Sequence, residues 1–273
     1  MVITLGNIVF GGKGNGGGAP AAYVVPDGMR FAKSLLTEFP SSAFDFSQKT
    51  NFSYCWYDCM SLTSFPLIDT SSGTSFANAW YNCTSLTSFP QLDLSNGSSF
   101  SMTWTFCSSL KEFPLINTAK GTDFNFAWGY CTSLTNFPML DLSSCTDFSN
   151  AWYYCEKLTE FPALNLSSGT NFYCAWNGCS SLTTIGQLDL SSGTDFTNAW
   201  SGCSKLTNLG GFGAISADID LSTSTLLTVD SLMNVITQAA TVTGKTMKFG
   251  SDNLAKLTDE QKAVATSKGW TLA

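Results

Sequence analysis

Apolar and aromatic residues recur at one fixed spacing through most of the chain. Tryptophan stands at seven positions, each 24 residues after the last: Trp56, Trp80, Trp104, Trp128, Trp152, Trp176 and Trp200. A phenylalanine lies four residues before each tryptophan, a cysteine three residues after it, and a leucine six residues after it. Self-similarity at such a period is the signature of repeat proteins, in which one structural unit stacks on the next.

Each repeat contains two segments with different periodicity. From Phe52 to Leu62 the apolar residues are three or four positions apart, which predicts a short helical or 3₁₀ turn with one buried face. Further along the unit, Leu92 and Leu94 flank Asp93, and this alternation predicts a short strand. The Phe-Pro pair before the strand indicates a corner, and the Ser-Ser-Gly-Thr segment after it supplies a turn.

One isolated coil of this kind would leave one side of its large apolar residues exposed. Neighbouring coils supply the missing contacts, so stability is a property of the stack. The fold class we predict is a repeat solenoid of the leucine-rich-repeat type, with short parallel strands and short helical or 3₁₀ turns in about seven 24-residue coils over residues 29–212.

Both ends of the chain depart from the repeat. Residues 213–273 predict a small α/β cap, with a helix over 228–240, a strand over 246–249, a second helix from Thr258 to Ser267 and a last extended segment at 270–272. At the other end, residues 1–28 predict an attachment strand followed by a flexible Gly-rich tether. The apolar start lacks a basic leader segment, so we expect folding in a cytoplasm.

Composition removes several classes of function. The chain has no histidine, which excludes Ser-His and Cys-His nucleophile pairs and histidine-ligated metal centres. A net charge of -7 with 13 Lys and Arg residues argues against nucleic acid and anionic membranes as partners. No apolar run approaches the roughly 18–20 residues of a membrane span. We therefore expect a non-enzymatic protein with no cofactor, no resident metal and no membrane insertion.

The repeat unit carries a family resemblance. The motif Ala-Trp-x-x-Cys-x-x-Leu-Thr-x-Phe-Pro-x-Leu-Asp-Leu-Ser-Ser-Gly-Thr resembles the BspA-like leucine-rich repeat, and the resemblance covers about residues 29–273. That family occurs in bacterial surface adhesins and in phage tail and fibre proteins, as binding or structural modules. The resemblance implies a phage virion protein, a tail or fibre component that recognises the host surface and is assembled in the host cytoplasm. A bacterial cell-surface or secreted adhesin is the alternative.

Aromatic residues outside the repeating columns are the candidate binding site. They follow the first five tryptophans of the column by one or two positions and vary from unit to unit: Tyr57, Tyr81, Phe106, Tyr130, Tyr153 and Tyr154. Exposed aromatic rings offer contact area at low entropic cost, so these residues, with Phe126 and Tyr173 elsewhere in the unit, predict a platform for a host-surface glycan or protein. An interface between subunits is an alternative use, and a homotrimer is one expected assembly. Residues 1–28 are expected to dock on other virion proteins.

Three other sets of residues invite chemistry. The cysteines that follow each tryptophan are expected to be small buried apolar residues rather than a redox or metal site. Two columns of Asp and Asn, which begin at Asp69 and Asp123, favour turn formation over calcium binding. Glu112 and Glu160 lie two coils apart, about 9.6 Å, close to the separation in inverting glycosidases. A polysaccharide-degrading fibre is therefore a further alternative, although any stacked lattice produces such spacings.

Overall fold

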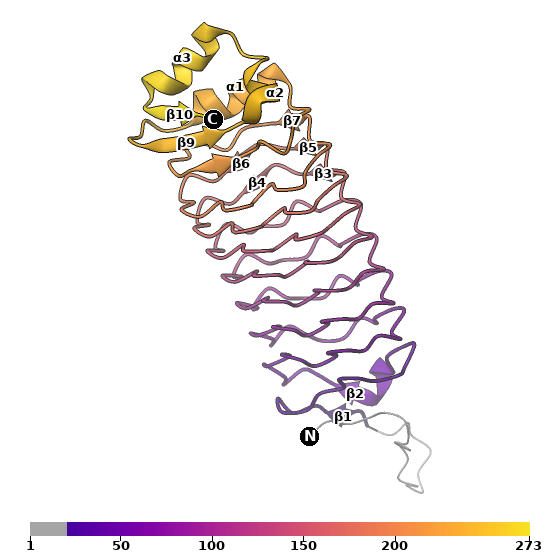
Figure 1. Cartoon of the computed structure of the whole chain (residues 1–273). Coiled ribbons are helices and arrows are strands. Elements are labelled where there is room, and N and C mark those ends of the chain that lie inside the picture. The colour runs from indigo at the N-terminus through magenta and orange to yellow at the C-terminus, as the bar shows by residue number, and fades with distance from the viewer. Residues whose placement is uncertain (1–20) are drawn as a thin grey trace, which may run out of the picture.

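The computed structural model describes residues 21–273, which form a long stack of coils closed at one end by helices (Figure 1). The regular elements are short, and in chain order they are β1 (Tyr23–Val24), η1 (Ser41–Ala43), β2 (Phe44–Asp45), β3 (Glu160–Phe161), β4 (Leu164–Asn165), β5 (Thr184–Ile185), β6 (Leu188–Asp189), β7 (Asn208–Leu209), β8 (Ile219–Asp220), α1 (Val229–Gln238), β9 (Lys245–Lys248), α2 (Gly250–Leu254), α3 (Asp259–Ser267) and β10 (Trp270–Leu272).

Parallel pairing between successive coils builds the rod. Strands β3, β5 and β7 form one sheet and β4 and β6 another, with each residue paired to the one 24 positions on. The earlier coils continue the first of these sheets through single bridges, such as Ser88 to Glu112, and a further column of bridges joins Asn51 to Ser75 and Ser75 to Ser99. The prediction of a repeat solenoid with short parallel strands is confirmed.

The turn that carries the tryptophan is not helical, so the predicted helical or 3₁₀ turn is wrong. Within a coil, the Cys55 amide donates to the Phe52 carbonyl at 3.0 Å, but the intervening Tyr54 has φ +59° and donates to Ala77 of the next coil. Asp58 repeats this pattern four residues later. Positive φ values at two positions in each coil stop helix propagation and turn alternate amides toward the neighbouring coil.

A column of stacked indoles runs through the core. Consecutive tryptophans from Trp56 to Trp200 lie 5.1–6.2 Å apart between ring centroids, with interplanar angles of 1–10°. A parallel column from Phe52 to Phe196 has spacings of 4.9–6.5 Å. Every one of these indoles is at most 1% exposed, so each ring face that a coil cannot cover itself is covered by its neighbours.

The indole N–H groups gain nothing from this arrangement. All seven Nε1 atoms of the column are buried and have no hydrogen-bond acceptor among the described residues. Leaving a buried donor unsatisfied costs roughly 1–3 kcal/mol. Stacking and apolar burial must therefore outweigh this cost in every coil.

The cysteine column is made of buried thiols. All ten cysteines lie in the described part of the chain and are free. From Cys83 to Cys203, each Sγ of the column donates to the carbonyl of the tryptophan in the preceding coil, at 3.2–3.4 Å. Burial is the main cause that raises the pKa of Cys107 and of Cys203 to about 12. These thiols are packing groups and weak donors, and they stay protonated at neutral pH.

A buried lysine closes the first coil. Lys49 is 1% exposed, and its Nζ donates to three backbone carbonyls, those of Pro26, Asp27 and Met29, at 3.0–3.1 Å. Strand β1 pairs in parallel with β2, with Tyr23 opposite Phe44, and Val25 is buried. Residues 23–28, which the sequence analysis assigns to the attachment segment, thus form part of the rod. The predicted strand and tether within residues 1–20 lie outside the described residues.

The cap replaces the next coil at the other end. Helix α1 packs on β7, and strands β8, β9 and β10 form a parallel sheet that α3 covers through β10 (Figure 1). Thr228 caps α1, and Thr258 makes a capping box at the start of α3. Lys268 donates to three carbonyls at the C-terminal end of α1, from Ile236, Thr237 and Ala239. The sequence did not predict the short helix α2.

Removing one indole from the middle of the column tests how strongly the stack depends on it. We expect Trp128→Ala to lower the free energy of unfolding by about 3–5 kcal/mol, because the cavity opens between two rings that cannot close the gap. Chemical denaturation followed by circular dichroism measures the change. Leu67→Ala, at a side chain 71% exposed, is the control and is expected to change stability by less than about 0.5 kcal/mol.

The buried thiols predict an alkaline loss of stability. Their pKa in the folded state lies above the value of about 8.5 in the unfolded chain, so their contribution is complete below that pH. As pH rises from about 9 toward 12, each thiol that ionises only on unfolding lowers the free energy of unfolding by about 1.4 kcal/mol per pH unit. Denaturation curves at pH 8, 9 and 10 measure this slope. Cys107→Ala combined with Cys131→Ala should make the slope shallower, and an unchanged slope would contradict the assignment.

Candidate functional site

The predicted aromatic residues come together on the turn side of the coils as one continuous chain of ring contacts. We call this set the aromatic ladder, and its members are Tyr57, Tyr81, Phe106, Tyr130, Tyr153 and Tyr154. The rings contact one another across five consecutive coils, with centroid distances of 4.6–5.5 Å. Five of these side chains are half-buried, and Tyr154 is exposed, with 37% of its surface accessible.

Two stacked pairs alternate with perpendicular steps along the ladder. Tyr57 and Tyr81 stack at 4.8 Å with an interplanar angle of 4°, and Phe106 and Tyr130 stack at 4.6 Å and 12°. The junction between these pairs, Tyr81 to Phe106, is perpendicular at 82°. Stacked rings cover each other's faces, so the pairs present mainly ring edges and hydroxyl groups to a partner.

Half of the ladder residues have an unfavourable backbone conformation. Phe106, Tyr130 and Tyr154 have φ of +62°, +59° and +55°, in the left-handed region that bulky residues rarely adopt. The last two coils have glycine at the equivalent positions, Gly178 and Gly202, also with positive φ. Left-handed backbone costs a residue with a Cβ roughly 1–2 kcal/mol, which glycine avoids. The backbone of these coils thus tolerates glycine where the ladder has an aromatic side chain.

A carboxylate lies beside the N-terminal end of the ladder. Burial, followed by the charge of Asp58, raises the pKa of Tyr57 and of Tyr81. Asp58 also accepts a hydrogen bond from the Asn82 side-chain amide at 2.8 Å. The phenol groups therefore stay protonated at neutral pH and can donate hydrogen bonds to a bound partner.

The ladder extends to Tyr54 at its N-terminal end and includes Phe126 beside Tyr153. Tyr54 lies 5.6 Å from Tyr57, and the Arg30 guanidinium lies over the Tyr54 ring at 5.1 Å. Phe126 contacts Tyr153 at 5.6 Å. Tyr54 and Phe126 both lie two positions before a tryptophan. The presence of an aromatic residue at that position was the signal in the sequence that could identify them. The contact with Arg30 had no such signal, because it joins segments separated by a whole coil.

The two Asp and Asn columns form turns. In the column that contains Asp93 and Asp141, one carboxylate oxygen accepts from the backbone amide and the hydroxyl of the serine two residues later. In the second column, Asp123 and Asp147 likewise accept the amide two residues on. Burial, together with the neighbouring Asp147, raises the pKa of Asp123. Within residues 21–273 no group of three or more acidic or Cys side chains is arranged to hold a metal ion.

The proposed glutamate pair lies on an exposed surface of the rod. Glu112 and Glu160 are both exposed, and each bridges to Asn136 in the coil between them. The structure keeps them two coils apart, as the spacing predicts. Asn136 therefore occupies the position between the two glutamates in the same column.

No described helix has both the length and the apolar character that crossing a bilayer requires. No model of a known protein family matches the chain, and no curated protein matches it. Among solved structures, an internalin from Listeria monocytogenes is similar over 89% of this chain and 77% of its own length, with 14% sequence identity and a TM-score of 0.36. At this level of similarity, the internalin assigns neither a partner nor a site to this chain.

Proposed function

We propose that this protein is a non-enzymatic recognition rod that binds a glycan or protein on a host surface through the aromatic ladder. The solenoid holds the ladder on a rigid core, because each coil is fixed by indole stacking and by hydrogen bonds to both neighbours. Rigid aromatic side chains lose little entropy on binding.

The observation that carries the proposal is the choice of aromatic residues at left-handed positions of the ladder. Phe106, Tyr130 and Tyr154 occupy positions where Gly178 and Gly202 would fit without cost. Each coil has two left-handed positions, so the positive φ belongs to the repeat, and what distinguishes Phe106, Tyr130 and Tyr154 is that a bulky aromatic residue occupies one of them. The same rings are not required to cover the core, since the indoles beneath them are buried in the glycine coils as well.

The resemblance of the repeat unit to BspA-like leucine-rich repeats supports a place for this rod in a phage tail or fibre. In that setting the part of residues 1–28 that precedes the rod attaches it to other virion proteins, and the protein is assembled in the host cytoplasm. The alternative is a bacterial surface adhesin, and an export signal encoded upstream of Met1 would favour it. A trimeric assembly is compatible with either setting.

Glycine substitutions in the ladder separate recognition from folding. We expect the triple variant Phe106→Gly, Tyr130→Gly, Tyr154→Gly to stay folded, because relief of roughly 1–2 kcal/mol of strain per site offsets the lost ring contacts of roughly 0.5–1.5 kcal/mol each. Binding of the fluorescently labelled rod to host bacterial cells, measured by flow cytometry, should fall at least about tenfold.

The matched control removes an exposed aromatic residue outside the ladder. Tyr173 is 42% exposed and makes no ring contact with the ladder residues, so Tyr173→Ala should leave cell binding unchanged. A triple variant that keeps its melting temperature and still binds cells as the unchanged protein does would overturn the assignment of the ladder.

Deleting residues 1–18 tests the attachment role. We expect the shortened chain to fold, since the described rod begins after this segment, but to be absent from purified phage particles. Immunoblots of particles from cells that express the full-length or the shortened chain provide the measurement. Incorporation of the shortened chain at the normal level would contradict attachment through this segment.

A further inference from the structure

A second surface of the rod exposes apolar side chains in a column. This column consists of the residues that follow each Phe-Pro pair, and we call it the apolar stripe: Leu67, Gln91, Leu115, Met139 and Ala163. Leu67, Leu115 and Met139 are 71%, 61% and 67% exposed, and half-buried prolines flank each of them. Four of these five neighbouring coils thus present an apolar group to solvent at this position, with Gln91 as the exception, whereas a monomeric protein usually avoids large exposed apolar patches.

An acidic column runs beside the apolar stripe, two residues further along each coil. It contains Asp69, Asp93, Asp141 and Asp189, with Asn117 and Asn165 between them, and all of these side chains are exposed. One oxygen of each carboxylate accepts the turn hydrogen bond, and the other has no partner within residues 21–273. Hydrogen bonds from the serine side chain and backbone hold the pKa of Asp93 and of Asp141 below the usual range.

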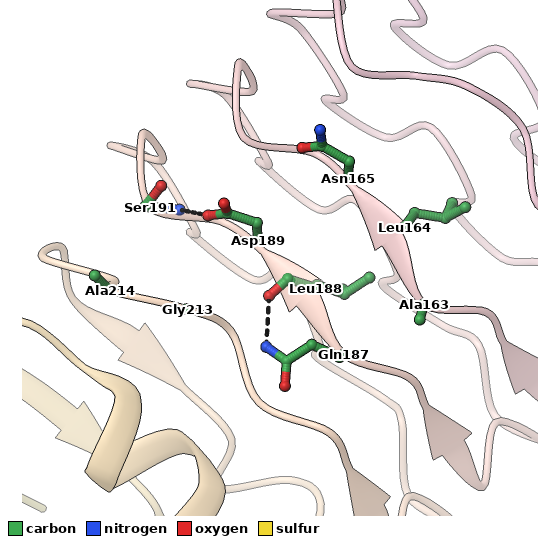
Figure 2. Close-up of a pocket in the computed structure, with 9 residues that line it drawn as sticks. All are labelled: Ala163, Leu164, Asn165, Gln187, Leu188, Asp189, Ser191, Gly213 and Ala214. Carbon is green, nitrogen blue, oxygen red and sulfur yellow. Dashed lines mark hydrogen bonds between the residues drawn. The ribbon is translucent and has the colours of Figure 1, made fainter.

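Both ends of this face are hollowed. At the C-terminal end a hollow of about 530 Å³ is lined by Ala163, Gln187 and Asp189 and opens where Gly213 and Ala214 replace larger side chains. Figure 2 shows Asn165 and Asp189 one coil apart on neighbouring strands, with Gly213 on the next segment. At the N-terminal end a second hollow, of about 310 Å³, is lined by Leu67 and Asp69 together with the 41–46 segment.

We propose that this face binds a cationic amphipathic helix of a partner protein, lying along the rod axis. The apolar side of the helix packs on the stripe, and its lysine or arginine side chains pair with the free carboxylate oxygens of the acidic column. The hollows at the two ends accept larger apolar side chains of the helix.

The dimensions of the face fit a helix better than an extended strand. Coils repeat at about 4.8 Å, and one helical turn advances about 5.4 Å, so successive turns stay near successive coils. On a strand laid along the same axis, side chains on one face repeat about every 6.8 Å, so they lose register with the coils after one step. From the coil of Leu67 to the coil of Gly211 is six steps, about 29 Å, the length of a helix of about 19 residues.

The charge of the face selects the occupant. In the stripe and in the acidic column, no position from Leu67 and Asp69 to Gln187 and Asp189 is a lysine or an arginine. A second copy of this chain docked through the same face would bring acidic columns together, and the chain already carries a net charge of -7. A basic partner satisfies both the apolar side chains and the carboxylates.

The test uses a synthetic peptide as the probe. An 18-residue fluorescein-labelled helix of leucine and lysine in amphipathic order is titrated with the full-length protein, and binding is followed by fluorescence anisotropy. The variant Leu115→Gln, Met139→Gln should raise Kd at least about tenfold. The variant Asp93→Asn, Asp141→Asn should raise Kd several-fold and flatten its dependence on salt.

Both variants are compatible with the fold, because the chain already uses these residues in the same columns. Gln91 and Gln187 stand in the column of the stripe, and Asn117 and Asn165 make the turn hydrogen bond in the acidic column. The charge-matched control is Glu156→Gln, Asp195→Asn, which removes two carboxylates elsewhere and should bind as the unchanged protein does.

Three results would overturn the proposal. They are equal weakening by the control variant, unchanged binding by the stripe variant, and self-association of the chain in sedimentation experiments that the stripe variant abolishes. The last result would assign the face to a second copy of the chain. None of these outcomes bears on the aromatic ladder, which lies nine or ten residues earlier in each coil.

Discussion

Every coil of this protein depends on aromatic stacking with the coils on either side. A single coil can cover only one face of its indole and its phenylalanine ring, so the next coil must supply the rest of the contact area. Alternate backbone amides also depend on the neighbouring coil, because they donate to carbonyls there rather than within their own coil. The ends of the stack therefore need special solutions. Lys49 provides one at the first coil, and the α1–β10 cap provides the other.

The repeat and the core columns were predictable from the sequence, but the local backbone conformation was not. Apolar residues four apart, such as Phe52 and Trp56, fit a helical turn and the observed succession of β-turns equally well. The evidence against a helix lay in the polar positions, since Asn78 and Asn82 lie two residues on either side of Trp80. Asparagine tolerates positive φ better than most residues, and this signal was weaker than the apolar pattern.

The aromatic ladder was predictable as a set of residues but not as a continuous chain of contacts. Its members were identified as aromatic side chains at variable positions beside the tryptophans, which keep a fixed 24-residue spacing. The ladder changes position within the coil, from one residue after tryptophan at Tyr81 to two residues after it at Phe106, yet the rings still meet. That contact depends on the left-handed conformation of Phe106, which apolar periodicity does not report. Left-handed backbone recurs at two positions in every coil, so the ladder uses a conformation that the repeat already imposes.

The near-identity of the coils has a consequence for any elongated partner. A surface that repeats at every coil offers several equivalent binding registers, displaced by one coil each, and a partner could slide among them at little cost. The residues that break the translational symmetry then decide the register: Gln91 interrupts the leucines, Asn117 and Asn165 interrupt the carboxylates, and Phe106 shifts the aromatic contacts. In a protein built from copies of one motif, positional information resides in the exceptions.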